Sequence, residues 1–365
     1  MTDDFDILNE TKESMTEVAK CPSCSAVMVF SPRKRMLVCG YCGQTKEIDL
    51  SNHAKEQPFY ILESSDSTEW GRDAHVFSCN NCGAKTILSK GEVAKSCPFC
   101  GTTNVIESEE IPGLKPNGIV PFSIEKDEAS SNILLWAKKK FFAPKAFKES
   151  ATPEELSGVY SPTFSFDAKT YSTYDGRLGE YYYETQRTSD GKTKQVRKTR
   201  YFTIRGTIDC PFDDILVRAT QSITQKDLTK LGDFNSNESY NYANEFLYGY
   251  SAETSSRTGL DCFRDAESIM NELIKKKILS NYSYDVVDYL NINVSYTDRS
   301  FKYLLLPLYI GHCNYKSKLY NVFVNGYNGK VTGKTPISFV KVLLVSLIII
   351  AIIALFGILL YYYEV

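Results

Sequence analysis

The chain has 365 residues, of which 43% are hydrophobic and 24% are charged, a balance typical of folded proteins that excludes wholesale disorder. Its 42 basic and 44 acidic side chains give a net charge of −2, so no global field draws it onto nucleic acid or an anionic membrane. The 25 tyrosines and 20 phenylalanines favour strands, and three histidines limit any His-based catalysis. Eleven cysteines are an odd number, which excludes a complete set of internal disulfides.

The N-terminal residues 1–20 are acidic and contain no apolar stretch, so we expect no secretory signal there. Eight of the eleven cysteines then follow as four C-x-x-C pairs. The pairs are Cys21/Cys24, Cys39/Cys42, Cys79/Cys82 and Cys97/Cys100. Fourteen residues separate the two pairs within each set, and every cysteine of the second set lies 58 residues after its counterpart. This self-similarity indicates an internal duplication of one unit.

Each C-x-x-C turn can place two thiolates about 2.3 Å from one zinc ion, and two such turns complete a tetrahedron. We therefore predict two small β zinc ribbons, 21–43 and 76–106, each with one Zn²⁺. A small residue follows each pair, as a tight turn requires: Ser25, Gly43, Gly83 and Gly101. Four protein ligands close each site, so both zinc ions are expected to be structural. Redox-active C-x-x-C pairs or disulfides are the alternative, against which the four-thiol repeat argues.

Each ribbon is expected to contain a hairpin. Strands at 27–30 and 36–38 flank the turn 31–35, and the second unit has a strand at 86–88 before the turn 89–91. Neither unit is large enough for a core of its own. Metal binding is therefore expected to supply most of its folding energy, on the order of 10 kcal/mol.

The turn residues Arg33, Lys34 and Arg35 are a candidate nucleic-acid contact. Residues 1–110, however, hold 11 basic against 17 acidic side chains, and eight thiolates with two Zn²⁺ make this region more negative still. Phosphate binding requires a net cationic face. The charge therefore favours a protein-docking role for the ribbons and leaves nucleic-acid binding as the first alternative function.

The middle of the chain is predicted to be an aromatic-rich α+β domain. A polar connector, 44–75, and a linker, 107–118, lead to this domain at 119–335, which carries a helical insertion around 213–280. Its predicted helices are 127–142 and 260–279. Its predicted strands are 163–174, 180–187, 195–208, 284–296, 303–313 and 320–324, with a hairpin turn at Asp190-Gly191.

This domain shows no catalytic signature. His312 and Cys313 are neighbours in a predicted strand, so their side chains point to opposite faces and cannot share a proton easily. Cys210 and Cys262 are interpreted as buried small hydrophobes. No phosphate-binding G-x-x-x-x-G-K-[ST] loop is present. We expect no enzyme activity and no small-molecule substrate, and an enzyme with an unrecognised site in 119–335 is the second alternative.

The C-terminal residues 340–361 are predicted to form a transmembrane helix, followed by a short tail, 362–365. Val342–Leu360 contains 19 residues without a charge and would span about 28 Å, close to the roughly 30 Å hydrocarbon core of a bilayer. A buried core helix is the competing interpretation, and the lack of a polar face argues against it.

Basic residues lie only on the N-terminal side of this helix. Lys330, Lys334 and Lys341 precede it, and no Lys or Arg follows it. Because positive flanks stay in the cytoplasm, we expect a single-pass cell-membrane protein with most of the chain cytoplasmic, inserted in the manner of a tail anchor.

Two sequence blocks resemble a known family. They are Tyr160-Ser161-Pro162-Thr163-Phe164-Ser165-Phe166-Asp167 with Tyr174-Asp175-Gly176-Arg177, and Tyr303-Leu304-Leu305-Leu306-Pro307-Leu308-Tyr309 with Val322-Phe323-Val324-Asn325-Gly326-Tyr327-Asn328-Gly329-Lys330-Val331. With the duplicated ribbons, they are similar to bacterial tail-anchored double zinc-ribbon membrane proteins, often labelled TFIIB-type or primosomal-like. Thr163-Phe164 replaces the aromatic pair usual in that family, and Tyr309 replaces its Trp.

The resemblance implies a tethering role, because some members are linked to phage-shock-type membrane-stress systems in which they help hold soluble partners at the membrane. We therefore expect a membrane-tethered cytoplasmic scaffold whose zinc ribbons dock protein partners, in an envelope-stress response.

Overall fold

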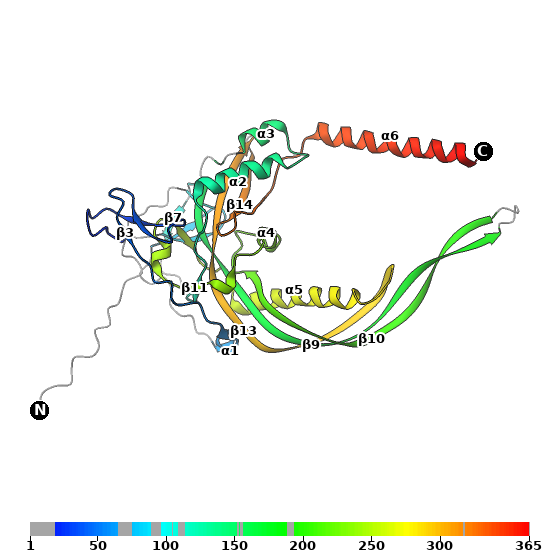
Figure 1. Cartoon of the computed structure of the whole chain (residues 1–365), viewed down its shortest axis with the longest axis horizontal. Coiled ribbons are helices and arrows are strands. Elements are labelled where there is room, and N and C mark those ends of the chain that lie inside the picture. Colours follow the sequence, from blue (N-terminus) through cyan, green and yellow to red (C-terminus); the bar gives the residue numbers. More distant parts are fainter. Residues whose placement is uncertain are drawn as a thin grey trace, which may run out of the picture.

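The computed structural model describes residues 19–64, 75–88, 96–103, 105–108, 114–151, 153, 156–187, 193–316 and 318–364. Most of the acidic N-terminal segment, the serine-rich part of the connector, the predicted turn 89–91 and the turn Asp190-Gly191 lie outside these residues. The described chain contains two groups of four cysteines, a sheet-rich body and one apolar C-terminal helix (Figure 1).

The first cysteine group is held by a small antiparallel sheet. Its strands are β1 (Met28–Ser31), β2 (Met36–Cys39) and β3 (Thr45–Lys46). The predicted hairpin around 31–35 is confirmed, and β3 extends the sheet beyond residue 43. We call residues 19–46 the first four-cysteine unit.

The second cysteine group is joined to the main sheet of the body. Its strands are β5 (His75–Cys79), β6 (Lys85–Leu88) and β7 (Val105–Ser108). β5 pairs with both β6 and β7, and β6 also pairs with β12 (Ser251–Glu253) of the body. We call the described residues of 75–108 the second four-cysteine unit. Although the two units are duplicated in sequence, only the second continues into the body's sheet.

The body is built on a mixed sheet of 12 strands among the described residues. Its longest strands are β9 (Leu156–Arg187), β10 (Thr193–Arg218) and β13 (Val286–Tyr315). Shorter strands complete it: β4 (Gln57–Pro58), β8 (Gly118–Ile119), β11 (Tyr240–Asn241), β14 (Lys318–Asn325) and β15 (Val331–Gly333). β9 lies between β10 and β13 and pairs antiparallel with both, whereas β8 and β12 pair parallel with β13 and β9 respectively.

The predicted strands 163–174 and 180–187 are in fact one continuous strand, and so are 284–296 and 303–313. The predicted break in the strand at Asp175-Gly176 is therefore wrong. A Cβ at Gly176 would lie 2.9 Å from the Tyr289 carbonyl oxygen and 2.9 Å from Leu290 Cδ1. Glycine here permits close approach of β13 within an unbroken ladder.

The interruption expected around 297–302 is a β-bulge. The register of β13 against β9 shifts between Thr297 and Ser300, and Asp298 has a φ of 48°. A second shift falls between Phe212 and Ile215 of β10, where Asp214 has a φ of 54°. Bulges bend the strands that carry them. The three long strands accordingly form a curved ribbon, and α5 (Gly259–Leu279) lies in its concavity (Figure 1).

About half of residues 213–280, the predicted helical insertion, are helical, and strands and loops make up the rest. Strand β10 continues to Arg218, and the helices in this region are α4 (Gln225–Leu231), α5 and the short 3-10 helices η1 (Ser236–Glu238) and η2 (Asn244–Leu247). The strand predicted at 195–208 is therefore longer in the structure than in the prediction. The helix predicted at 260–279 is confirmed, with buried Met270 and Ile274 facing the sheet.

The helix predicted at 127–142 is shorter in the structure. α2 (Lys126–Lys138) ends at Lys138, and a separate helix, α3 (Lys145–Ser150), follows Pro144. The apolar side chains of Phe141 and Phe142, which extend the predicted pattern, are instead exposed in the loop between the two helices. The side of α2 that carries Ile133 is buried in the core.

The described part of the connector 44–75 packs on the body, although its sequence is polar. β4 pairs with β13, and α1 (Tyr60–Ser64) places Leu62 in the core beside Phe263 of α5. His53 stacks on Tyr240 at a ring-centroid distance of 4.9 Å. The connector thus joins the first four-cysteine unit to the body through a packed segment.

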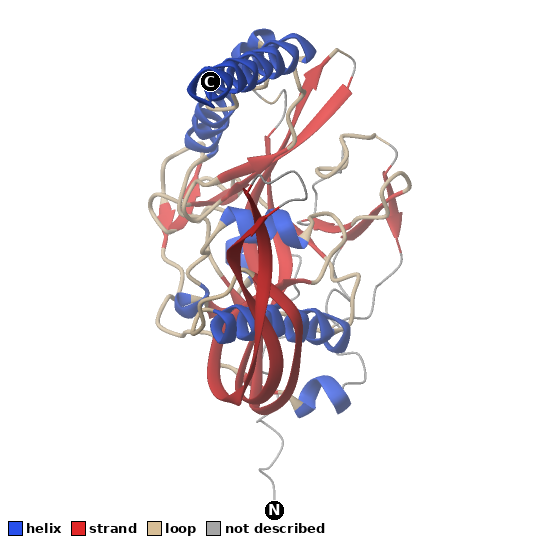
Figure 2. Cartoon of the chain, turned by 90° about the vertical axis from the view of Figure 1, so that its right-hand side faces the viewer, coloured by secondary structure: helices blue, strands red, loops and turns tan. Residues whose placement is uncertain are grey.

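The C-terminal helix α6 (Phe339–Glu364) projects from the body (Figures 1 and 2). Phe339–Leu359 is long and apolar enough to cross a membrane, and 0% of its apolar window is buried. This exposure excludes the buried core helix that was the competing interpretation. Lys341 does not point away from the protein, because its Nζ donates to the carbonyl oxygens of Phe141 (3.1 Å) and Ala143 (2.8 Å).

Candidate metal centres

The four C-x-x-C turns share one backbone geometry. In each, the amide of the residue after the second cysteine donates to the carbonyl of the first cysteine, at 2.8–3.0 Å. That residue has a left-handed φ in every turn: Ser25 (60°), Gly43 (77°), Gly83 (73°) and Gly101 (71°). Glycine adopts this conformation without strain, and a small polar residue tolerates it. The predicted small residue at this position is confirmed, and the left-handed φ explains why a small residue is needed.

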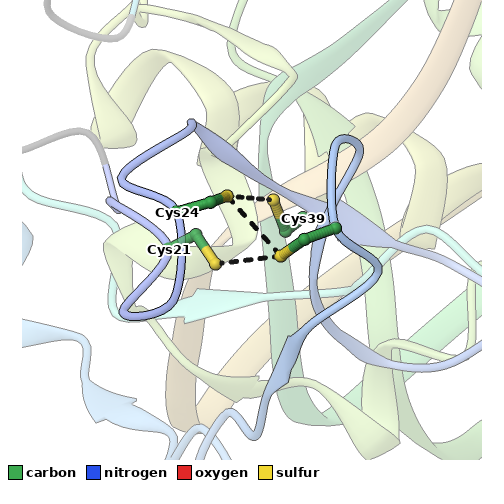
Figure 3. A group of neighbouring side chains, drawn as sticks. Cys21, Cys24 and Cys39 are labelled. Atoms are coloured by element: carbon green, nitrogen blue, oxygen red, sulfur yellow. Dashed lines mark hydrogen bonds between the residues drawn. The ribbon is translucent and has the colours of Figure 1, made fainter.

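These turns bring the eight predicted ligands together in two groups. In the first group, Sγ of Cys21 lies 3.4 Å from Sγ of Cys42, and Sγ of Cys24 lies 3.5 Å from that of Cys39. The side chains of Cys21, Cys24 and Cys39 point toward one another (Figure 3). In the second group, the Cys79–Cys100 and Cys82–Cys97 separations are 3.6 and 3.7 Å.

This spacing fits a tetrahedral metal ion. Four sulfurs at about 2.3 Å from a central ion would lie about 3.8 Å apart. Within each group, all four sulfurs lie within 4.8 Å of one another, and all eight cysteines are free of disulfides. Each group can therefore hold one metal ion with four thiolate ligands.

Backbone amides favour the thiolate form of one buried cysteine in the first group. The amide of Cys42, followed by that of Tyr41, lowers the pKa of Cys39 to about 6, against the raising effect of burial. In the second group, burial opposes but does not outweigh the amides of Cys82 and Asn81, and the pKa of Cys79 falls to about 7. Each group also contains thiols with raised pKa values: the pKa of Cys24 is about 12 although the Ala26 amide lowers it, because burial and the neighbouring thiols outweigh that amide, and burial raises the pKa of Cys82 to about 11. A metal ion would have to displace the protons of these thiols on binding.

The first four-cysteine unit is docked on the body by its hairpin. Phe30 packs edge-on against Phe246, with ring centroids 5.5 Å apart, and its amide donates to the carbonyl oxygen of Tyr248 at 2.9 Å. Ser31 Oγ donates to Oε1 of Glu125, just before α2, at 3.3 Å. These contacts place one face of the hairpin in the body's core.

The second four-cysteine unit is docked by polar side chains of β13 and β14. Nε2 of His312 donates to the carbonyl oxygen of Pro98 at 3.0 Å, and Nδ2 of Asn321 donates to that of Phe99 at 3.2 Å. Phe99 itself is buried against the apolar side chains of the sheet. His312, set aside as a nucleophile partner in the sequence, therefore holds the Cys97/Cys100 turn. No sequence signal connects residues so far apart.

The basic turn Arg33, Lys34 and Arg35 is exposed at the tip of the first unit. The backbone amide of Arg33 donates to Oε1 of Glu125 at 3.3 Å. The turn thus lies beside a carboxylate, which reduces its local positive charge.

Sequence reasoning missed a group of carboxylates where the connector meets the sheet. Oxygens of Glu56, Asp167 and Asp213 lie within 4.8 Å of one another. Burial, followed by the hydrogen bond with Glu56, raises the pKa of Asp167 to about 7. Beside them, Lys302 Nζ lies 3.1 Å from Oδ1 of Asp214, both largely buried. Glu56 and Asp167 are far apart in sequence, and they meet because β4 and β9 both pair with β13 around Ser300.

The three remaining cysteines are buried outside both groups: Cys210, Cys262 and Cys313. Burial raises the pKa of Cys262 to about 12 and that of Cys313 to about 11. Thiols with raised pKa values are poor nucleophiles at neutral pH. Cys210 and Cys262 fit their predicted role as buried small hydrophobic side chains, and Cys313 is buried as well.

One similar protein matches most of the chain, and its name gives no activity. No family model matches the chain, and no solved structure matches it. It is similar to the uncharacterized protein YdjG of Bacillus subtilis (strain 168), with 26% identity over 333 residues. The matched region covers 88% of this chain and 91% of YdjG.

Proposed function

We propose that this protein is a membrane-tethered scaffold that presents two zinc-bound four-cysteine units to protein partners. The observation that carries the proposal is that the four-cysteine units lie on one side of the body, whereas α6 extends away from it on the other (Figure 1). A helix that anchors one end leaves the other free for docking. Tethering raises the local concentration of whatever the four-cysteine units bind.

Zinc is the proposed metal because four cysteine thiolates at tetrahedral spacing suit it, and its role is structural because four protein ligands leave no open position. The first four-cysteine unit is docked on the body through Phe30 and Ser31, and the second through its turn at Pro98 and Phe99. Metal binding would therefore set the shape of the docking surface rather than perform chemistry.

The proposed orientation places the body and the four-cysteine units in the cytoplasm. Lys330, Lys334 and Lys341 flank α6 on the body side, in agreement with the positive-inside rule. Free thiols also persist in the reducing cytoplasm. An envelope-stress role belongs to this proposal on the strength of the family resemblance alone.

The two alternative functions have less support. Nucleic-acid binding would use Arg33, Lys34 and Arg35, but their turn lies against Glu125. For an enzyme, a pocket of about 300 Å³ beside α4 offers Asp214 and Asp233, and its lining contains no histidine or cysteine. We therefore propose a non-enzymatic role.

The proposal is tested by crosslinking in intact cells, followed by isolation of the full-length protein from membranes and mass spectrometry of its crosslinked partners. We expect the protein in the carbonate-resistant membrane fraction, with two zinc ions per chain and the same soluble proteins recovered in repeated experiments. In the variant Cys42→Ser, which removes one ligand of the first unit, partner recovery should fall while the membrane fraction stays unchanged. Recovery of nucleic-acid machinery alone, or equal partner recovery with the variant, would overturn it.

A further inference from the structure

We propose that the far end of the β9–β10 hairpin binds the anionic headgroups of the bilayer that holds α6. This inference rests on the proposed function, because it takes α6 to be membrane-embedded. We call residues 177–187 and 193–205 the hairpin arm.

The hairpin arm extends beyond the rest of the sheet. β13 pairs with β9 only as far as Gly179, so Glu180–Arg187 and Thr193–Arg200 pair with each other alone. Tyr181–Arg187 are all exposed. A two-stranded ribbon buries little surface by itself. Its side chains are thus available to a partner.

One face of the arm carries arginine and tyrosine side chains. Residues directly opposite each other in an antiparallel pair project from the same face, and the register pairs Arg197 with Tyr183 and Thr199 with Tyr181. The same alternation places Tyr201 and Arg177 on this face. We call Arg177, Tyr181, Tyr183, Arg197 and Tyr201 the Tyr/Arg face.

The arginines of this face stack on its tyrosines. The Arg197 guanidinium lies 4.3 Å from the ring centroid of Tyr181, and that of Arg177 lies 4.4 Å from the ring of Tyr201. Tyr183 is 65% exposed. Stacking holds the guanidinium groups over the strands, where their remaining N–H groups can reach an anion.

The opposite face of the arm balances its charges internally. Lys198 forms an ion pair with Glu184, and Arg200 lies opposite Glu180 in the register. Closer to the body, Leu178 and Ile204 on this opposite face are buried against Ile274 and Ile278 of α5. On the Tyr/Arg face, Arg177 forms an ion pair with Asp288 of β13 at 3.7 Å, whereas Arg197, nearer the tip, forms no ion pair among the described residues. The Tyr/Arg face is therefore the side that is free of α5, and its unpaired positive charge lies near the tip.

The arm leaves the body on the same side as α6. Both views show the arm and α6 reaching in the same direction, with α6 above the arm (Figures 1 and 2). The base of α6 is attached through Lys341 and through the Ser338 amide, which donates to the Phe142 carbonyl oxygen at 2.8 Å. Because the arm and α6 point the same way, α6 has to turn relative to the body, with loss of the Lys341 contacts, for it to cross the bilayer while the polar arm lies along its surface.

A lipid surface matches the arm better than other anionic partners. Residues 177–205 contain eight basic and three acidic side chains in a chain whose net charge is −2. Tyrosines at the headgroup level and basic side chains beside an anionic leaflet are the usual composition of a membrane interface. The bilayer is also the one polyanion that α6 holds within reach of the arm.

The test uses the full-length protein inserted into vesicles, with flotation as the measure of tethering and chymotrypsin cleavage at Tyr181–Tyr183 as the measure of arm accessibility. One set of vesicles is phosphatidylcholine, and the other contains phosphatidylglycerol as well. We expect flotation with both, and arm cleavage at least about tenfold slower on the anionic vesicles, with the protection lost in high salt.

The double variant Arg177→Gln/Arg197→Gln should lose most of this protection. Arg33→Gln/Arg35→Gln makes the same charge change at the other end of the molecule and should keep it. Failure to float with either vesicle would refute the proposed tether. Flotation with equal cleavage on both vesicles would leave the tether standing and overturn the arm proposal, as would protection of the arm by RNA or DNA on neutral vesicles but not by anionic lipid.

Discussion

The residue directly after each C-x-x-C pair shows how local backbone geometry builds the metal centres. Its left-handed φ turns the chain so that both thiols of a pair face the same point. Three of the four positions use glycine, and Ser25 accepts the same conformation at φ 60°. The repetition of one geometry in all four turns gives both sites the same set of four cysteine ligands, so that loss of one cysteine should empty one site only.

Replacement of one ligand, Cys42→Ser, should therefore lower the bound zinc from two ions to one per chain. The second group keeps its four thiolates and its ion. Elemental analysis of the purified full-length protein measures the change. Cys210→Ala, which removes a buried cysteine outside both groups, is the control and should retain two. Retention of two ions by the Cys42 variant would contradict four-cysteine ligation.

A buried carboxylic acid in the body is a second feature at the scale of single residues. Glu253 is 2% exposed, and Oε1 accepts from the hydroxyls of Thr220 and Ser222, while Oε2 has no partner among the described residues. Burial raises the pKa of Glu253 to about 7, although both hydroxyls favour the charged form. The folded state therefore holds a proton that the unfolded chain releases near pH 4.3.

Stability should consequently fall as the pH rises toward 7, because the folded state binds more protons than the unfolded state across this window. The total effect of Glu253 is roughly 4 kcal/mol between the two pKa values. Glu253→Gln keeps an acceptor for both hydroxyls and should remove this contribution. Urea unfolding in detergent at pH 5 and pH 7 measures the slope.

Cysteines of the two four-cysteine groups also titrate in this range, but they contribute equally to both proteins, so the difference in slope isolates Glu253. The exposed Glu272→Gln is the matched control and should leave the slope unchanged. Identical slopes for wild type and the Glu253 variant would show that Glu253 is ionised in the folded protein.

Among the secondary-structure elements, the sequence alone predicts α6 but not the full length of the long strands. α6 follows from composition alone, since its apolar side chains have no partner in the described part of the body. The 32-residue strand β9 depends on β10 and β13. The backbone pairing with these two neighbours continues β9 through Asp175-Gly176, where an isolated strand would end.

Two charges in the middle of α6 should prevent stable membrane insertion. Ile349→Arg with Ile353→Arg places both charges on one face, and each costs about 3 kcal/mol relative to insertion of the apolar helix. The carbonate-resistant membrane fraction should fall sharply. Ile349→Leu with Ile353→Leu preserves the apolar surface and should behave as wild type. Full retention of the arginine variant in membranes would indicate that the protein is held there by other means.

On the scale of the whole molecule, both four-cysteine units are integrated into the body rather than flexibly attached. The second unit shares a sheet with the body through β6 and β12, and the first inserts Phe30 among the body's aromatic rings. Metal binding should for this reason stabilise the body as well as the four-cysteine units.

The His312 contact offers a test of this coupling. His312→Ala removes the hydrogen bond to the Pro98 carbonyl and should loosen the Cys97/Cys100 turn. Hydrogen–deuterium exchange of the zinc-bound protein should increase at residues 97–103 and remain unchanged in the first four-cysteine unit. His53→Ala, which removes a stacked histidine from another part of the body, should leave exchange at 97–103 as in wild type. No increase in the His312 variant would show that the second unit is held by apolar packing alone.

The sequence by itself determined the features that repeat or act locally: the eight ligands, the small residue after each pair, the first hairpin, α5 and the apolar C-terminal helix. Each depends on residues close together in the chain, so spacing and periodicity reveal it. Only the tertiary structure decided the unbroken strands, the packed connector, the carboxylates at Glu56 and Asp167, and the docking of the second unit by His312. These features arise from strand pairing between distant segments, and that pairing overrides local propensity and brings together side chains that no local pattern relates.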